Sequence, residues 1–301
     1  MRVEVVAPAK VNLSLRVTGK RPDGYHELLS IMAPVSLFDR LAVERLPRGG
    51  LIEVDSSGSP FVTGGEGNIS HRASRFFFEE TGASGGVRIN VEKNIPVGAG
   101  LGGGSSDAAS TIMALELLFG VKLSADARKR AGFSVGADVP FFFNQGPARV
   151  GGIGELVEPL PDVAKLWLVL VHPGVFLSTA TVFSRFNIGL TRTGRPNTIA
   201  CFDFQGIIEG MENDLEASAR ELEPQIGLAM EALNGAGALS SMMTGSGSAA
   251  FGIFKNAEDA KAAASAIQAG ATGDWRVEAV HTLTGPGDYP EVKKFWGVGK
   301  R

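Results

Sequence analysis

The sequence is poor in the residue types that support disulfide, thiolate-metal and polyanion chemistry. Among its 301 residues Cys201 is the single cysteine, which excludes an intramolecular disulfide and a thiolate metal cluster. Lys and Arg total 29 against 32 Asp and Glu, and the resulting net charge of -3 argues against a nucleic-acid partner bound by counterion release. The net charge does not exclude a small anionic ligand, because a local group of N–H donors can bind an anion without a net positive charge.

Long apolar runs are also missing. The most apolar stretch, residues 166–171, is too short to cross a bilayer. Residues 1–10 enter a strand pattern at once, without the apolar core of a signal peptide. We therefore expect a cytoplasmic protein with no membrane attachment.

Strand and helix patterns mix along the chain without a strict alternation, which predicts an α+β fold. Period-2 alternation of apolar residues predicts strands, and a spacing of three to four predicts helices. The main expected elements are strands at 11–17, 87–91 and 166–171, a hairpin of 41–44 with 51–54, and helices at 70–80, 105–119 and 215–233. Glycines at 151–154 and prolines near 160 divide the chain into two expected domains, 1–155 and 156–301.

Glycine is the one residue type in clear excess, with 40 residues. Its densest cluster, KNIPVGAGLGGGSSD at 93–107, follows a predicted strand and opens a predicted helix. Glycines let a backbone approach an anion closely, and a helix N-terminus presents unpaired N–H groups with a partial positive charge. The segment predicts a phosphate-binding loop, in which Ser105 or Ser106 can also reach a metal ion bound to the phosphates.

Three better-known phosphate motifs do not fit this loop. Gly98, Gly100 and Gly103 match G-x-G-x-x-G, but no strand ending in an acidic residue follows about 20 positions later. The Walker pattern fails because no lysine follows the glycines. The ordered motifs of protein kinases are absent as well.

Polar residues mark three further segments. Lys10, Asn12 and Ser14 share one face of a predicted strand, and a turn then leads to Tyr25 and His26, which can stack on and hydrogen-bond a planar base. Asp138, in GADVPFFF, suits either a general base or the N-cap of a helix that Pro140 begins. A second glycine–hydroxyl loop, SSMMTGSGSAAF at 240–251, suits either a ligand or a plain turn.

In this order the segments resemble the signature motifs of the GHMP kinases. The segment at 96–109 is similar to their second motif, which wraps the triphosphate of ATP; GADVPFF is similar to their catalytic aspartate motif, and 240–251 to their third motif. The resemblance covers most of the chain. It implies a two-lobed GHMP kinase fold, with a lobe like domain 2 of ribosomal protein S5 at 1–155, a ferredoxin-like lobe at 156–301, and a cleft between them for ATP and substrate.

The resemblance implies roles for residues around ATP. Asp138 is expected as the base, with Lys10 holding it and polarising the attacking hydroxyl. Mg²⁺ is expected on the ATP phosphates and Ser106, and Asn68 is expected near the adenine because GNISHRA is similar to the family stretch E-N-L-x-x-R-A. The expected triphosphate contacts are Pro96, Val97, Gly98, Ala99, Gly100, Leu101, Gly102, Gly103, Gly104, Ser105 and Ser106.

The string at 8–28 resembles the GHMP kinases that phosphorylate the 2-hydroxyl of a cytidine-diphosphate-linked methylerythritol. This resemblance implies that Tyr25 stacks on the cytosine, that His26 reads its polar edge and that Phe183 covers its other face. Asn12, Thr244 and Gly245 complete the expected substrate contacts. We expect no macromolecular partner, and a monomer or weak homodimer.

Two other functions stay open. Another GHMP kinase, such as a homoserine or mevalonate kinase, would differ in the N-terminal string that carries Tyr25 and His26. A non-catalytic nucleotide sensor on the same fold would lack the Lys10 and Asp138 pair.

Overall fold

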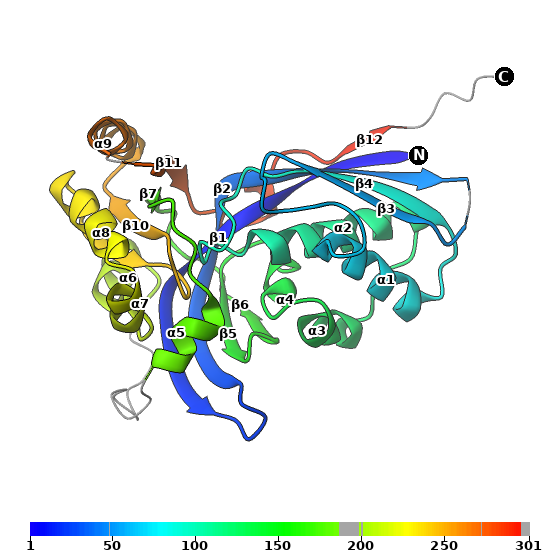
Figure 1. Cartoon of the computed structure of the whole chain (residues 1–301), viewed down its shortest axis with the longest axis horizontal. Helices are drawn as coiled ribbons and strands as arrows, with labels where there is room; N and C mark the ends of the chain where they lie inside the picture. Colours follow the sequence, from blue (N-terminus) through cyan, green and yellow to red (C-terminus); the bar gives the residue numbers. More distant parts are fainter. Residues whose placement is uncertain (48, 187–198, 200, 272, 296–301) are drawn as a thin grey trace.

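The computed structural model describes residues 1–47, 49–186, 199, 201–271 and 273–295. Its strands form two sheets (Figure 1). The larger sheet is built on a long curved hairpin of β1 (Arg2–Lys20) and β2 (His26–Leu46), which runs through the molecule and past the smaller sheet. The two-lobed α+β fold expected from the sequence is confirmed. None of the helices in the described ranges is long and apolar enough to cross a membrane.

The larger sheet has the order β12-β1-β2-β4-β3, and β5, β6 and β8 attach beside it. Its other strands are β3 (Ile52–Ser57), β4 (Gly86–Glu92), β5 (Ala148–Gly152), β6 (Leu156–Pro159), β8 (Glu212–Asn213) and β12 (Lys293–Phe295). The smaller antiparallel sheet has the order β11-β7-β10-β9. It consists of β7 (Trp167–His172), β9 (Ser240–Met243), β10 (Ala250–Phe254) and β11 (Arg276–His281).

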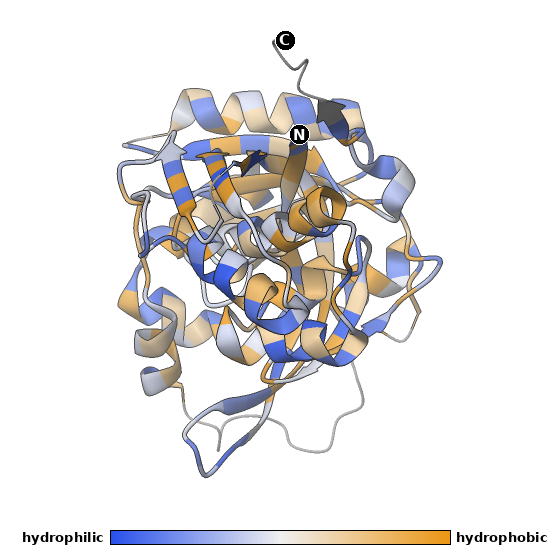
Figure 2. Cartoon of the chain, turned by 90° about the vertical axis from the view of Figure 1, so that its right-hand side faces the viewer, coloured by the Kyte–Doolittle hydropathy of each residue, from blue (hydrophilic) through white to orange (hydrophobic). Residues whose placement is uncertain are grey.

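Helices cover one face of each sheet (Figure 1). On the larger sheet these are α1 (Ile69–Thr81), α2 (Gly103–Phe119), α3 (Ala125–Ser134) and α4 (Val139–Phe142). On the smaller sheet these are α8 (Gln225–Gly235) and α9 (Ala257–Gly270). Of the remaining helices, α6 (Phe204–Gly210) packs against β1, α7 (Glu216–Leu222) packs against α8, and α5 (Thr179–Arg185) lies beside the lower half of the hairpin. Apolar residues fill the strands and inner helix faces, whereas the hairpin tip is hydrophilic (Figure 2).

One hydrophobic cluster joins the two sheets. It combines Val11 and Ile31 of the hairpin with Leu101 of the glycine-rich loop and with Leu168 and Phe251 of the smaller sheet, all buried. Apolar burial of this kind contributes about 1.5–3 kcal/mol per large side chain. The cluster therefore holds the glycine-rich loop between the hairpin and the smaller sheet.

The structure corrects two expected elements. The hairpin of 41–44 with 51–54 is wrong, because β4 lies between β2 and β3, and β3 runs parallel to β4. The helix expected over 215–233 is two helices, since Glu223 is extended before Pro224, as residues preceding proline prefer. The domain boundary after 155 falls inside the β5–β6 hairpin, and β8 and β12 return to β1, so that boundary stays a prediction.

Candidate active site

The glycine-rich loop joins β4 to α2, as the sequence predicted. Gly98, Gly100 and Gly102 have φ angles of 67°, 74° and 71°, in the left-handed region that favours glycine. A Cβ on Gly100 would lie 2.3 Å from the carbonyl oxygen of Thr244, and one on Gly102 would lie 2.9 Å from Cγ of Lys10. The absence of side chains is therefore what allows the loop to pack against these two segments.

Backbone hydrogen bonds tie the three motif segments together. The N–H of Lys10 donates to the carbonyl of Leu101 over 3.0 Å, and the N–H of Ala249 donates to the carbonyl of Ala99 over 3.1 Å. The strand of the first motif and the loop of the third thus flank the glycine-rich loop. Segments far apart in the sequence form one site.

Lys10 and Asp138 meet in this site. The Lys10 Nζ lies 3.8 Å from Asp138 Oδ2, and it donates to Asn12 Oδ1 over 2.5 Å. Lys10 is buried, and burial lowers the pKa of its ammonium while the charge of Asp138 opposes that shift. Asp138 occupies the N-cap position of α4, yet its side chain makes no capping bond within the described structure, so its carboxylate is available for other contacts.

Asn12 links Lys10 to the third motif. Its Nδ2 donates to Ser30 Oγ over 2.8 Å, and its backbone N–H donates to Thr244 Oγ1 over 3.0 Å. Thr244 Oγ1 also lies 3.3 Å from Asn12 Oδ1. Gly245 follows with φ 59°, and a Cβ there would stand 3.2 Å from Lys10 Nζ. The predicted residues Asn12 and Gly245 therefore lie beside the Lys10 ammonium, and Thr244 contacts Asn12.

Sequence reasoning missed Asn213, which supports the third motif. Its Nδ2 donates to the carbonyls of Met243 and Gly245 over 2.8 and 2.9 Å, and its Oδ1 accepts from the N–H of Leu215. One side chain thus fixes the turn that carries Thr244. The polar Asn213-Asp214 pair just before a predicted helix was the signal that could have marked it.

An aromatic pair forms away from the ammonium, between the hairpin and α5. The rings of His26 and Phe183 stack with centroids 4.7 Å apart at 21°, and Phe186 meets His26 edge-on at 6.3 Å. Burial, followed by repulsion from Lys20, lowers the pKa of His26 and favours the neutral ring. Tyr25 is 61% exposed at the hairpin tip. The structure thus brings two of the three predicted base-reading residues into contact.

Asn68 has a structural role in the described chain. Its Oδ1 accepts from the N–H of Ser70 and caps α1, while its Nδ2 donates to the carbonyl of Thr63, both over 2.9 Å. Both polar atoms of the amide are therefore used. An adenine contact of Asn68 stays a prediction.

The residues at the start of α2 fit a phosphate-bound cation better than a separate metal centre. The Ser106 hydroxyl is fully buried and has no hydrogen-bond partner among the described residues. No group of three or more His, Cys, Asp or Glu side chains capable of holding a metal occurs in the described part of the chain. A hydroxyl without a partner beside the loop suits a ligand that arrives with ATP.

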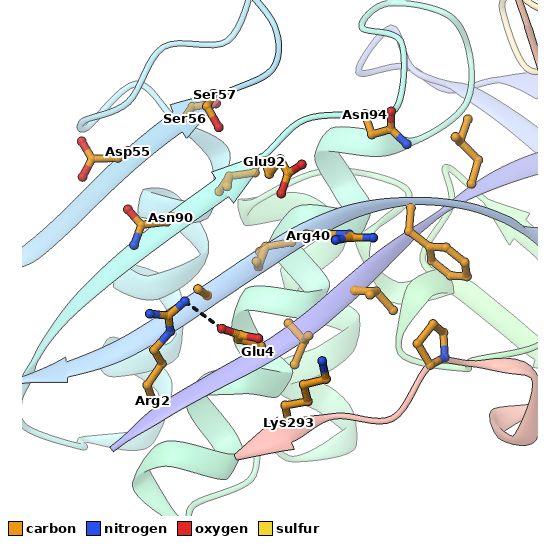
Figure 3. A pocket seen from close by; sticks show the side chains of 18 of the residues that line it. Arg2, Glu4, Arg40, Asp55, Ser56, Ser57, Asn90, Glu92, Asn94 and Lys293 are labelled. Atoms are coloured by element: carbon orange, nitrogen blue, oxygen red, sulfur yellow. Dashed lines mark hydrogen bonds and ion pairs between the residues drawn. The ribbon is translucent and has the colours of Figure 1, made fainter. Parts of the chain in front are cut away.

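A separate groove of about 820 Å³ lies on the open face of the larger sheet (Figure 3). Its walls carry charges of both signs, including the Arg2–Glu4 ion pair, Arg40, Asp55 and Lys293. None of the predicted site residues lines it. A polar, solvated face is ordinary for an antiparallel sheet, so the groove's volume alone does not indicate a site.

Known protein families match both halves of the chain. Residues 68–146 match the GHMP kinases N terminal domain, and residues 198–272 match the GHMP kinases C terminal domain. A crystal structure of 4-(cytidine 5'-diphospho)-2C-methyl-D-erythritol kinase superposes with a TM-score of 0.79 at 35% identity, covering 94% of this chain and all of that one. Homoserine kinase from Cytophaga hutchinsonii, at 20% identity and a TM-score of 0.74, shares the fold.

Two relatives have a name that is synonymous with the name of that structure. The 4-diphosphocytidyl-2-C-methyl-D-erythritol kinase of Geobacter sp. (strain M21) is 42% identical over 94% of this chain and 99% of its own length. The enzyme of that name from Syntrophus aciditrophicus (strain SB) is 39% identical over 93% of this chain and 99% of its own. With this identity over nearly the full length, the chain belongs to the GHMP kinases and, within them, to the 4-diphosphocytidyl-2-C-methyl-D-erythritol kinase family.

Proposed function

We propose that this kinase transfers the γ-phosphoryl group of ATP to the 2-hydroxyl of 4-diphosphocytidyl-2-C-methyl-D-erythritol, a step of the non-mevalonate route to isoprenoid precursors. The observation that carries the proposal is the Lys10–Asp138 pair at 3.8 Å beside the glycine-rich loop. A GHMP kinase acting on a small alcohol needs a base, a cation and a phosphate cradle, and this arrangement supports Asp138, Lys10 and the glycine-rich loop in those roles.

In this mechanism Asp138 accepts the proton of the substrate hydroxyl as its oxygen attacks the γ-phosphorus. The bond from that phosphorus to the bridging oxygen of ADP breaks. Lys10 orients the hydroxyl and balances the charge that develops near it. Asn12 holds the ammonium in place through the 2.5 Å bond to its Oδ1.

The triphosphate is expected to bind along 96–106, where positive-φ glycines precede the N-terminus of α2 with its free N–H groups. Ser106 would hold Mg²⁺ together with the phosphates. When bound, the ion supplies charge neutralisation for the transferred group.

Recognition of cytidine is assigned to the hairpin and α5. His26 and Phe183 already stack on each other, and the ring of Tyr25, the residue before His26, is exposed and able to cover a base. Thr244 and Gly245 would contact the part of the substrate near Lys10. Activity as a monomer or weak homodimer in the cytoplasm belongs to the same proposal.

The test is phosphorylation of three acceptors in parallel: the cytidine substrate, mevalonate and homoserine. We expect product only from the first, and a fall in kcat of about 10²–10⁴ in Asp138→Asn with both KM values little changed. Asp55→Asn, an exposed aspartate on β3, is the control and should behave as wild type. Product from another acceptor would overturn the substrate assignment, and no product from any would favour a nucleotide sensor.

A further inference from the structure

Three buried ionisable residues lie under the phosphate-binding loop and take no part in the mechanism above. Asp39 on β2, Lys93 after β4 and Asp107 on α2 are 0%, 6% and 3% exposed. The Lys93 ammonium donates to Oδ2 of Asp39 and, over 2.6 Å, to Oδ2 of Asp107. We name these three residues the loop clamp.

The clamp holds both ends of the loop. The second oxygen of Asp39, Oδ1, accepts from the backbone N–H groups of Asn94 and Ile95, the latter over 2.7 Å. These are the first residues of the loop, whereas Asp107 directly follows its last hydroxyl, Ser106. One carboxylate on β2 therefore fixes the start of the loop through its backbone and the end of the loop through Lys93.

The clamp also contacts the turn in which α2 begins. A Cβ on Gly103 would lie 3.0 Å from Cγ2 of Ile95 and 3.4 Å from Lys93 Nζ. Gly103 is the first residue of α2, whose free N–H groups are the expected phosphate donors. A shift of Lys93 or Asp39 would thus reach these donors directly.

Stability alone does not explain a buried Asp39–Lys93 ion pair with a third ionisable group beside it, Asp107, whose pKa burial raises to about 8. Replacing a buried ion pair by well-packed apolar residues is often neutral or stabilising, because desolvation offsets the attraction between the charges. The Asp39 carboxylate accepts hydrogen bonds from two backbone N–H groups and from the Lys93 ammonium. These directional bonds fix the position of the backbone, which apolar contacts would not do. The glycine-rich loop needs such a constraint, since glycine loses the most conformational freedom on ordering.

We propose that Asp39 and Lys93 are positioning residues for ATP: they set the separation of the two ends of the phosphate-binding loop and so determine nucleotide affinity. The proposal rests on the function proposed above for that loop. It assigns no contact with the cytidine substrate, because the clamp lies on the side of the loop toward β2 and β4. Loss of the clamp should therefore weaken the binding of ATP and leave the binding of the cytidine substrate unchanged.

The test compares Lys93→Met and Asp39→Asn with the control Arg88→Met. Arg88 lies on β4 and makes an exposed ion pair with Glu53 at 2.7 Å, so its loss removes a charge without touching the clamp. We expect both clamp variants to raise the KM for ATP by about tenfold to a hundredfold, the usual effect of a lost charge-assisted hydrogen bond. The KM for the cytidine substrate should stay within about twofold of wild type, and Arg88→Met should change neither.

Calorimetric titration with ADP, at a temperature below each variant's unfolding transition, separates this proposal from the proposed function. Weaker ADP binding in the clamp variants supports positioning even if the wild type phosphorylates another acceptor. If Lys93→Met does not fold, Asp39→Asn supplies the measurement by itself, because it keeps the size of the side chain but removes the charge that binds the Lys93 ammonium and the N–H groups of Asn94 and Ile95. Equal rises in both KM values, or a lower Tm with unchanged ADP affinity, would overturn the proposal.

Discussion

The Lys10 ammonium is hydrogen-bonded to Asn12 and only charge-paired with Asp138: its Nζ lies 2.5 Å from Asn12 Oδ1 and 3.8 Å from Asp138 Oδ2. At 3.8 Å the second contact is too long for a hydrogen bond. The carboxylate thus lies within reach of the positive charge, and its oxygens are not occupied by a hydrogen bond from Lys10 or by a helix-capping bond. Asn12, rather than Asp138, holds the lysine in position.

Lys10 should impose an alkaline limit on catalysis. Burial lowers the pKa of its ammonium below that of an exposed lysine, so the charge is lost as pH rises through the lowered value. We expect wild-type kcat to fall there, and Lys10→Met to have a kcat lower by about 10²–10³ with no such fall. A pH profile of kcat for both proteins is the measurement.

The lowered pKa of Lys10 also predicts how the stability of the protein depends on pH, which tests the pKa shift independently of catalysis. Between the folded and unfolded pKa values of Lys10 the unfolded chain binds more protons, so wild-type stability should rise with pH across that window relative to Lys10→Met. Thermal unfolding at several alkaline pH values tests this. An identical pH dependence of kcat in the two proteins would contradict a role for this ammonium in catalysis.

Gly100→Ala should damage the site through a clash as well as through its backbone angle. The new Cβ would meet the Thr244 carbonyl oxygen at 2.3 Å, so either the glycine-rich loop or the third motif must move. We expect kcat/KM to fall at least about tenfold, as small displacements of reacting groups do. Gly120→Ala is the matched control: its φ of 69° is similar, but open space surrounds it in the described structure. It should cost about 1–2 kcal/mol of stability and leave kinetics unchanged.

Asn213→Ala should loosen the third motif. It leaves the carbonyls of Met243 and Gly245 without their side-chain donor, at a cost of about 1–3 kcal/mol in the free energy of unfolding. Because Gly245 lies beside Lys10, kcat/KM should also fall by about tenfold. Asn90→Ala, at an exposed position on β4, should change neither quantity. Wild-type kinetics in Asn213→Ala would mean that the turn keeps its geometry unaided.

Phe183→Ala should weaken binding of the cytidine substrate alone. Removing the ring that stacks on His26 at 4.7 Å should raise the KM for that substrate by about three- to tenfold, the usual worth of an aromatic pair. The KM for ATP should not change. Phe133→Ala, which removes a ring 59% exposed on α3, is the control. A rise in the KM for ATP, with no change in the KM for the cytidine substrate, would show that Phe183 does not belong to the cytidine site.

Local features of the fold could be predicted from the sequence because their causes are local. Gly82 and Gly120 end α1 and α2 in the left-handed conformation, and Ser124 caps α3, each as its residue type favours. The glycine-rich loop between a strand and a helix is likewise visible in composition and period. The residue types that phosphate and hydroxyl chemistry require are therefore recognisable in the amino-acid sequence alone.

Which of these residues meet depends on tertiary packing. Asn12 and Thr244 are 232 positions apart, and their contact exists because the hairpin packs on the smaller sheet through a shared hydrophobic cluster. The insertion of β4 between β2 and β3 has the same kind of cause, since strand order depends on long-range pairing. The loop clamp was invisible in the sequence for this reason, and Asn213 had only its place before a predicted helix to mark it: a side chain that holds a distant backbone leaves no periodic signal of its own.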